Sequence, residues 1–219
     1  SVFICLHPGL PPDCLGQAGA GWGRLAQVQV WLIPVQHYRS LENVALQNAW
    51  LTIGVFDGVH RGHQQLIRNL TAGAHAIDAP AVVLTFYPHP AVVLGKPNGL
   101  KYLTLPDEKA ELLGALGVDA VITHPFDADV AALSAGEFMN RVQAHVGLRQ
   151  LWVGYDFALG RGREGNVARL IELGKALGYT VQAIEPVKES GEVISSSSIR
   201  AQLAAGQVVA HDLDALPVA

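Results

Sequence analysis

The feature that most constrains the fold is a regular alternation of short apolar runs with amphipathic segments between residues 50 and 206. The apolar runs, which predict buried strands, are 50–56, 81–88, 119–126, 150–157 and 179–187. The segments with helical periodicity are 61–77, 105–117, 134–146, 166–178 and 195–206. Apolar strands that alternate with helices are typical of a parallel sheet covered on both faces. We therefore predict an α/β fold with a parallel sheet of about five strands.

The bulk composition excludes several classes of protein. The chain has 219 residues, of which 50% are hydrophobic and 16% are charged, as in an ordinary globular protein. Its net charge of −4 gives no basic field for nucleic acid. No apolar run reaches the roughly 18 residues of a membrane span. The two cysteines, Cys5 and Cys14, form no CxxC motif, so we expect a reducing, cytoplasmic location.

The composition also divides the chain. Residues 1–34 are rich in glycine and proline, and we expect a poorly ordered or loosely packed extension. The "GAGWG" at 19–23 superficially resembles a dinucleotide loop, but no strand precedes it. We predict that residues 35–210 form the functional domain and that 211–219 form a short tail.

Polar and glycine-rich segments follow several of the predicted strands. His60 and His63 follow the first, "YPHP" the second, "HPFD" the third and "YDFALGRGREG" the fourth. In open parallel sheets, ligands bind beyond the carboxyl ends of the strands. The sequence therefore predicts a binding site at that edge of the sheet.

The stretch "TIGVFDGVHRGHQQLI" (52–67) has the features of an anion site. Gly58 and Gly62 permit a tight turn, and the helix that follows offers free N–H groups. His60 and His63 are neighbours on its first turn and could both donate to phosphate oxygens. Three alternatives remain open. A metal site would need a third ligand and lacks HExxH, the histidines could be incidental caps, and a dinucleotide site would need GxGxxG.

Four segments, in order, resemble the motifs of one family. "GVFDGVHRGHQQLI" resembles the GxFDGxHxGHxxL form of prokaryotic FAD synthetases, which are HIGH-type nucleotidyltransferases. "LTFYPHP" (84–90) is similar to their TFxPHP, "VGYDFALGRGREG" (153–165) to GxDFxFGxxxxG, and "ISSSSIR" (194–200) to ISSTxIR. The resemblance implies a Rossmann-like doubly wound sheet. It also implies Mg²⁺-dependent transfer of AMP from ATP to FMN, which gives FAD and pyrophosphate.

The resemblance also implies the roles of individual residues. The catalytic group is His60, His63 and Arg200. The ATP-binding residues are Gly54, Phe56, Asp57, Gly58, Gly62, Asp156, Arg161, Ser195, Ser196 and Ser197. The flavin-binding residues are Phe86, Pro88, His89 and Pro90, with Tyr87 as a further wall of the flavin site. Neither the residues nor the resemblance indicate which side chains would bind the magnesium ion.

Each of these roles has a structural alternative. Phe86 could belong to the core, the serines could only cap a helix, and Asp57 could only form a turn. Asp156 could cap a loop, and Arg161 and Arg163 could be solvated.

The chain departs from the family pattern at three places. Leu159 stands where an aromatic residue is usual, and Ser198 where a basic residue is common. The last 15 residues are too few for the riboflavin kinase barrel of the bifunctional proteins, so we expect that domain to be absent. Two other functions stay open. One is a non-catalytic flavin- or nucleotide-binding remnant, and the other is a nucleotidyltransferase with a different phosphate acceptor.

Overall fold

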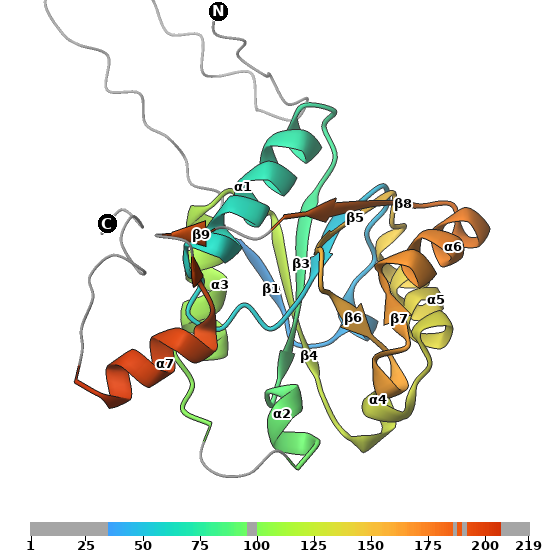
Figure 1. Cartoon of the computed structure of the whole chain (residues 1–219). Coiled ribbons are helices and arrows are strands. Elements are labelled where there is room, and N and C mark those ends of the chain that lie inside the picture. The colour runs from blue at the N-terminus through green and yellow to red at the C-terminus, as the bar shows by residue number, and fades with distance from the viewer. Residues whose placement is uncertain (1–34, 96–99, 186–187, 190–191, 207–219) are drawn as a thin grey trace, which may run out of the picture. The chain divides into compact units, whose positions relative to one another are not determined.

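All neighbouring strands of the main sheet run parallel in the computed structural model (Figure 1). The structure describes residues 35–95, 100–185, 188–189 and 192–206. Within these residues the sheet has six strands in the order β1-β4-β3-β2-β5-β8. Their bounds are β1 Gln36–Tyr38, β2 Trp50–Ile53, β3 Ala81–Tyr87, β4 Ala120–Pro125, β5 Gln150–Gly154 and β8 Thr180–Ile184. The predicted α/β fold with a doubly wound parallel sheet is confirmed.

The prediction of about five strands was one too few. The additional strand, β1, is a three-residue edge strand that pairs with β4, with Gln36 opposite Ala120. Its residues are half-buried or exposed. An edge strand with so little buried surface produces no apolar run, and the hydrophobic pattern that revealed the other strands was therefore absent.

The predicted helices are present, with their ends moved by at most two residues. The long helices are α1 Arg61–His75, α3 Pro106–Ala115, α5 Ala135–Val146, α6 Val167–Leu177 and α7 Ser196–Ala204. Shorter elements are the helices α2 Pro90–Val93 and α4 Ala128–Ala132, the 3-10 turns η2 Leu41–Asn43 and η3 Arg161–Arg163, and the strands β6 Ala158–Leu159, β7 Gly165–Asn166, β9 Lys188–Glu189 and β10 Glu192–Val193. The predicted extension 1–34 and tail 211–219 lie outside the described residues.

Among the predicted strands that end sooner than expected, two lead into the candidate site. The run 50–56 leaves the sheet after Ile53, and the run 150–157 leaves it after Gly154. The apolar residues beyond these points continue the hydrophobic pattern without continuing the strand. They line the site described below, so the misplaced ends coincide with functional segments.

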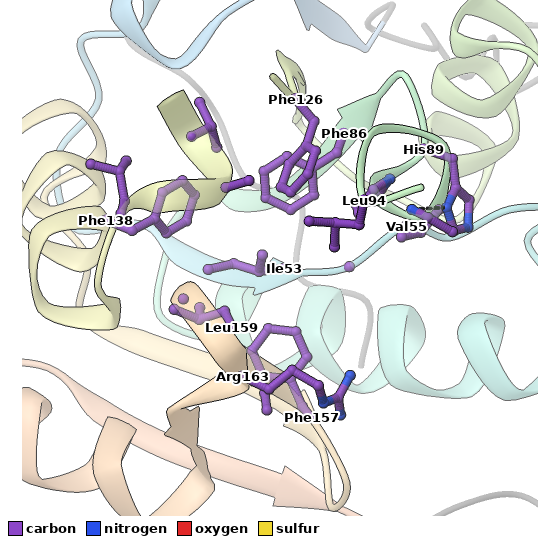
Figure 2. Close-up of a pocket in the computed structure, with 18 of the residues that line it drawn as sticks. Ile53, Val55, Phe86, His89, Leu94, Phe126, Phe138, Phe157, Leu159 and Arg163 are labelled. Atoms are coloured by element: carbon purple, nitrogen blue, oxygen red, sulfur yellow. Dashed lines mark hydrogen bonds between the residues drawn. The ribbon is translucent and has the colours of Figure 1, made fainter. Parts of the chain in front are cut away.

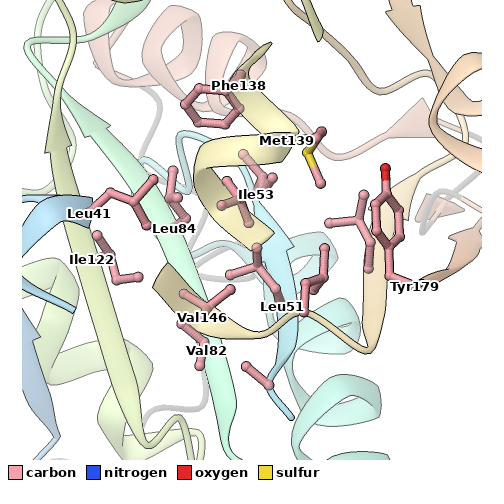
Figure 3. Close-up of a cluster of buried hydrophobic side chains, with 14 of the residues drawn as sticks. Leu41, Leu51, Ile53, Val82, Leu84, Ile122, Phe138, Met139, Val146 and Tyr179 are labelled. Atoms are coloured by element: carbon pink, nitrogen blue, oxygen red, sulfur yellow. The ribbon is translucent and has the colours of Figure 1, made fainter. Parts of the chain in front are cut away.

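The central strands β2, β3 and β4 are buried on both faces, and their side chains are mainly apolar. Side chains of successive residues point to opposite faces, so Val82 and Leu84 of β3 meet one helical layer and Val83 meets the other. Helices α5 and α6 cover the first face, and α1 and α3 cover the second (Figure 1). Figure 3 shows the larger cluster, in which Met139 and Val146 of α5 pack over β2 and β3.

The order of the strands fixes where a ligand can enter. From β2 the chain proceeds through β3 and β4 on one side, and through β5 and β8 on the other. The loops after β2 and β5 therefore diverge at the carboxyl edge, which is the topological switch point where such sheets bind ligands. Helices α2 and α4 and the β6–β7 hairpin gather at this edge (Figure 1). No helix in the described part of the chain is long and apolar enough to cross a membrane.

Two glycines, one in α6 and one in α5, allow a test of how tightly these helices pack. A Cβ added at Gly174 of α6 would lie 2.5 Å from the carbonyl oxygen of Tyr179, which is held by the backbone. Gly174→Ala should lower the free energy of unfolding by about 1–2 kcal/mol, because overpacking outweighs the gain in helix propensity. Gly136→Ala in α5 is the matched control, since its nearest neighbour would be 3.7 Å away. Urea unfolding measures both, and equal stabilities would contradict the described packing.

Candidate active site

The turn between β2 and α1 has an unusual backbone. Phe56 (φ 50°), Gly58 (φ 79°) and Val59 (φ 41°) all lie in the left-handed region. Glycine adopts this region freely, whereas a β-branched residue such as Val59 is strained there. Strain of this kind persists only where the surroundings hold the backbone in place, and it concentrates at functional sites.

Asp57 is the residue that holds this turn. Its carboxylate is 1% exposed, and Oδ1 accepts hydrogen bonds from the backbone N–H groups of Leu103 and Thr104, each at 3.0 Å. Oδ2 forms an ion pair with Arg200 of α7. The Asp57 carbonyl accepts a hydrogen bond from the Ser196 hydroxyl at 2.9 Å. One buried carboxylate therefore joins the turn, the loop before α3 and the start of α7.

His60 and His63 lie side by side on this turn, as predicted. Their rings stack with centroids 3.6 Å apart and an interplanar angle of 23°. The ring of Phe56 meets His63 edge-on at 5.1 Å. A Cβ at Gly62 would lie 3.3 Å from the His60 ring, so glycine leaves room for the stack. The geometry supports a shared role for the two histidines and argues against incidental capping, since no side-chain cap is formed by His60.

The electrostatic surroundings keep His63 neutral. Burial lowers the pKa of His63 well below its ordinary value, and the nearby groups His60 and Lys109 lower it further. Its Nδ1 atom is buried and has no hydrogen-bond partner among the described residues. A neutral imidazole still offers one N–H donor and one acceptor. His63 can therefore form hydrogen bonds without carrying a positive charge.

Lys109 of α3 is a residue that the sequence reasoning missed. Its side chain is buried under the turn, and Nζ donates to the Val55 carbonyl at 2.7 Å and to the Thr85 hydroxyl at 3.5 Å. Burial lowers its pKa to about 8, while the carboxylate of Asp57 opposes the shift. A signal existed, because Lys109 shares the buried face of α3 with Ala110 and Leu113. A lysine on an apolar helix face needs a buried partner.

A cavity of about 630 Å³ opens beside the turn, at the carboxyl ends of β2 and β3. Its walls are mainly apolar, with four phenylalanines that come from four different segments, Phe86, Phe126, Phe138 and Phe157. Figure 2 shows Phe86 and Phe126 on one side, and Phe157, Leu159 and Arg163 on the other, with Ile53 and Val55 between them.

The cavity contains part of the predicted flavin site. Phe86, His89 and Pro90 line it, whereas Pro88 does not. Tyr87 also lies outside the cavity lining. Its side chain is 42% exposed, and its ring centroid lies 5.6 Å from that of Tyr102. Residues of a strand alternate between faces, so Phe86 and Tyr87 cannot both face the cavity.

The predicted ATP-binding residues lie in several parts of the site. Gly54 and Asp156 line the cavity, and a Cβ at Gly54 would meet the Phe56 ring at 2.9 Å, so the cavity and the histidine turn adjoin. The other residues of the turn lie around His60 and His63. Arg161 is not among the residues that line the cavity, whereas Arg163 is, and Arg163 donates to the Asp156 carbonyl at 3.2 Å.

In the serine segment 195–198, Ser195 and Ser196 have structural roles, and Ser197 is exposed. Ser195 caps α7 by accepting from the Ser198 N–H at 3.2 Å, and Ser196 bonds the turn. Arg200 is held by Asp57 and by the Lys101 carbonyl, to which Nε donates at 2.8 Å. The start of α7 is thus fixed against the histidine turn.

His124, to which the motifs assign no role, lies behind the cavity. Its Nδ1 accepts from the Leu41 N–H at 3.3 Å, and its ring centroid is 6.4 Å from that of Phe86. Burial lowers its pKa, which suits a neutral ring that accepts a backbone hydrogen bond. His124 supports the aromatic wall from behind.

The comparisons with known proteins identify the family of the chain. The family model for FAD synthetase matches residues 42–198. Bifunctional riboflavin kinase/FMN adenylyltransferases of Escherichia coli K12 and Haemophilus influenzae are 34% and 36% identical over 171 and 174 residues. Each alignment covers 78% of this chain, and 55% and 56% of the respective relative. The corresponding protein of Pseudomonas fluorescens is 37% identical over 70% of this chain and 50% of its own length.

A solved structure supports the fold. A crystal structure from Streptococcus pneumoniae, described as a macrolide-efflux protein, superposes with a TM-score of 0.71 and 25% identity, over 80% of this chain and 58% of that one. The chain spans about half the length of the curated relatives that it matches. Because the family model covers well over half of the chain, and its motifs converge on one edge of the sheet, the chain belongs to the FAD synthetase family.

Proposed function

We propose that this protein transfers the adenylyl group of ATP to FMN, which yields FAD and pyrophosphate. The observation that carries the proposal is an aromatic cavity that adjoins a strained turn with two stacked histidines. At about 630 Å³ the cavity is within the usual range of small-molecule sites. Its phenylalanines suit the planar, apolar isoalloxazine ring of FMN.

The histidine turn suits the phosphates of ATP. The N-terminus of α1 presents backbone N–H groups and a positive dipole end, both of which favour anions. His60 and His63 add side-chain donors there. Arg200 reaches the same turn from α7, and because its Nε and Nη2 bind the protein, we assign phosphate contact to its Nη1 group.

The reaction then needs no protein nucleophile. An oxygen of the FMN phosphate forms a bond to the α-phosphorus of ATP, and the bond from that phosphorus to the oxygen that bridges the α- and β-phosphates breaks, so that pyrophosphate leaves with this oxygen. The attacking phosphate is already ionised, so no general base is required. The protein's contribution is to align the two anions and to place hydrogen-bond donors where their charges meet.

Magnesium is expected to accompany ATP, but we assign it no protein ligands. In the described part of the chain, no three His, Cys, Asp or Glu side chains form a group that could hold a metal ion. Asp57 already binds Arg200 and two backbone donors.

We further propose, from the composition, a cytoplasmic location and small molecules as partners, with neither nucleic acid nor membrane.

The direct test is incubation of the protein with FMN, ATP and Mg²⁺, followed by chromatography for FAD and an assay for pyrophosphate. Both products should appear in equal amounts. FMN binding without FAD would instead identify a non-catalytic remnant. Pyrophosphate release with another phosphate acceptor, and none with FMN, would identify a different nucleotidyltransferase.

His63→Ala should lower kcat by about 100-fold, because removal of one preorganised donor typically has an effect of this size on the transition state. The Kd for FMN should change little, because the FMN ring lies in the aromatic cavity. His75→Ala is the control, since His75 is on the same helix and contacts only the exposed Asp119 among the interactions that the structure describes. Steady-state kinetics and flavin fluorescence give the two quantities, and an unchanged kcat would remove His63 from the phosphate site.

Ala131→Trp should weaken FMN binding by about tenfold or more, because the indole would occupy the cavity that Ala131 of α4 lines. The neighbouring Ala132 is exposed and does not line the cavity, so Ala132→Trp should leave the Kd unchanged. Fluorescence titration with FMN compares the two variants. Equal affinities would mean that the flavin binds elsewhere.

A further inference from the structure

The buried ammonium group of Lys109 has no role in the mechanism given above. Nζ donates to the Val55 carbonyl at 2.7 Å and to Thr85 Oγ1 at 3.5 Å, and Thr85 Oγ1 in turn donates to the same carbonyl at 2.9 Å. Lys109 is 4% exposed. Burial of an ammonium group is costly, so a lysine in this place has a specific use or a strong partner.

The position of Lys109 links it to both halves of the site. Val55 lines the flavin cavity, and the next residue, Phe56, touches the ring of His63. The Val55 carbonyl that Lys109 binds therefore lies between the cavity and the histidine turn. The ammonium group reaches this carbonyl from α3, on the face of the sheet that α1 and α3 cover.

The charge of Lys109 acts on two groups of the turn. Asp57 attracts it and raises its pKa, whereas His63 is made harder to protonate by it. Asp57 is also neutralised by Arg200, so Lys109 is not needed as its only counter-ion. The remaining effect is a fixed positive charge behind the histidine pair, where the phosphates of ATP are proposed to bind.

We propose that Lys109 is a positioning residue for adenylyl transfer. Its ammonium group fixes the carbonyl end of β2 beneath the histidine turn and supplies positive charge behind the phosphate site. This inference rests on the function proposed above. Lys109 touches neither substrate in this arrangement and acts through Val55 and His63.

The pH dependence separates this role from a merely structural one. The folded-state pKa of Lys109 is about 8, below its ordinary value. As the pH rises through 8 the charge is lost, so kcat should fall on the alkaline side. The folded protein binds this proton less tightly than the unfolded chain does. The free energy of unfolding should therefore rise with pH between about 8 and the ordinary lysine pKa of 10.5. Activity and stability should therefore change in opposite directions.

The variant Lys109→Met keeps the apolar stem and removes the charge. We expect kcat to fall by about 10-fold to 100-fold, the KM for FMN to stay within about twofold, and the alkaline limb near pH 8 to disappear. Lys175→Met is the control, because Lys175 is an exposed lysine on α6, on the other face of the sheet. A Lys109→Met enzyme with wild-type kcat and an intact alkaline limb would overturn the proposal.

A spectroscopic readout tests the charge without turnover. NMR titration of the His63 ring, assigned with His63→Gln, should show a higher pKa in Lys109→Met than in the wild type, while the pKa of His75 stays the same. An unchanged His63 pKa would overturn the placement of the charge. If the wild type makes no FAD, the proposed function fails, and this titration still decides whether Lys109 acts on His63.

A milder substitution applies if Lys109→Met does not fold. Thr85→Val removes the hydroxyl that contacts the ammonium group and leaves the bond from Lys109 to Val55 in place. Loss of this contact should lower the pKa of Lys109 and move the alkaline limb to a lower pH. A limb that stays at the wild-type pH in Thr85→Val would contradict the proposal.

Discussion

The buried carboxylate of Asp57 is the interaction on which the site depends. It accepts two backbone N–H groups from the loop before α3 and pairs with Arg200, which lies 143 positions further along the chain. Removal of one partner from such a buried pair leaves an uncompensated charge, which is strongly destabilising. The pair therefore fixes the strained turn after β2 and the start of α7 as one unit. The histidines and the serine segment owe their relative position to it.

Around this unit, the charged and the apolar parts of the site lie next to each other. The proposed phosphate side combines the N-terminal dipole of α1, two stacked histidine rings and the buried Lys109. The proposed flavin side has phenylalanines from β3, the loop after β4, α5 and the loop after β5. Gly54 and Val55 belong to the boundary between the two sides. The proposed reaction joins two phosphates, one of which carries a flat apolar ring, and it needs both environments within the length of one nucleotide.

Much of this arrangement could be predicted because it is local in the sequence. The buried strands and amphipathic helices were visible from their periodicity, and the histidine turn from its glycines and from the strand-to-helix transition. The strand β1 was missed because three half-exposed edge residues leave no pattern. Tyr87 was assigned to the cavity from its neighbour Phe86, although alternation along β3 directs it elsewhere. Lys109 was missed because a single lysine on an apolar helix face is easily taken for a solvated residue.

The sequence by itself determined the parallel α/β architecture, the edge of the sheet that carries the site and the family to which the chain belongs. These follow from hydrophobic periods and from motifs whose residues lie close together in the chain. Only the tertiary structure decided which residues act on one another. It paired Asp57 with Arg200, placed Lys109 beneath Val55 and separated Arg163, in the cavity wall, from Arg161. The physical reason is that burial and charge interactions depend on distance in space, and residues from distant segments meet only when the sheet has formed.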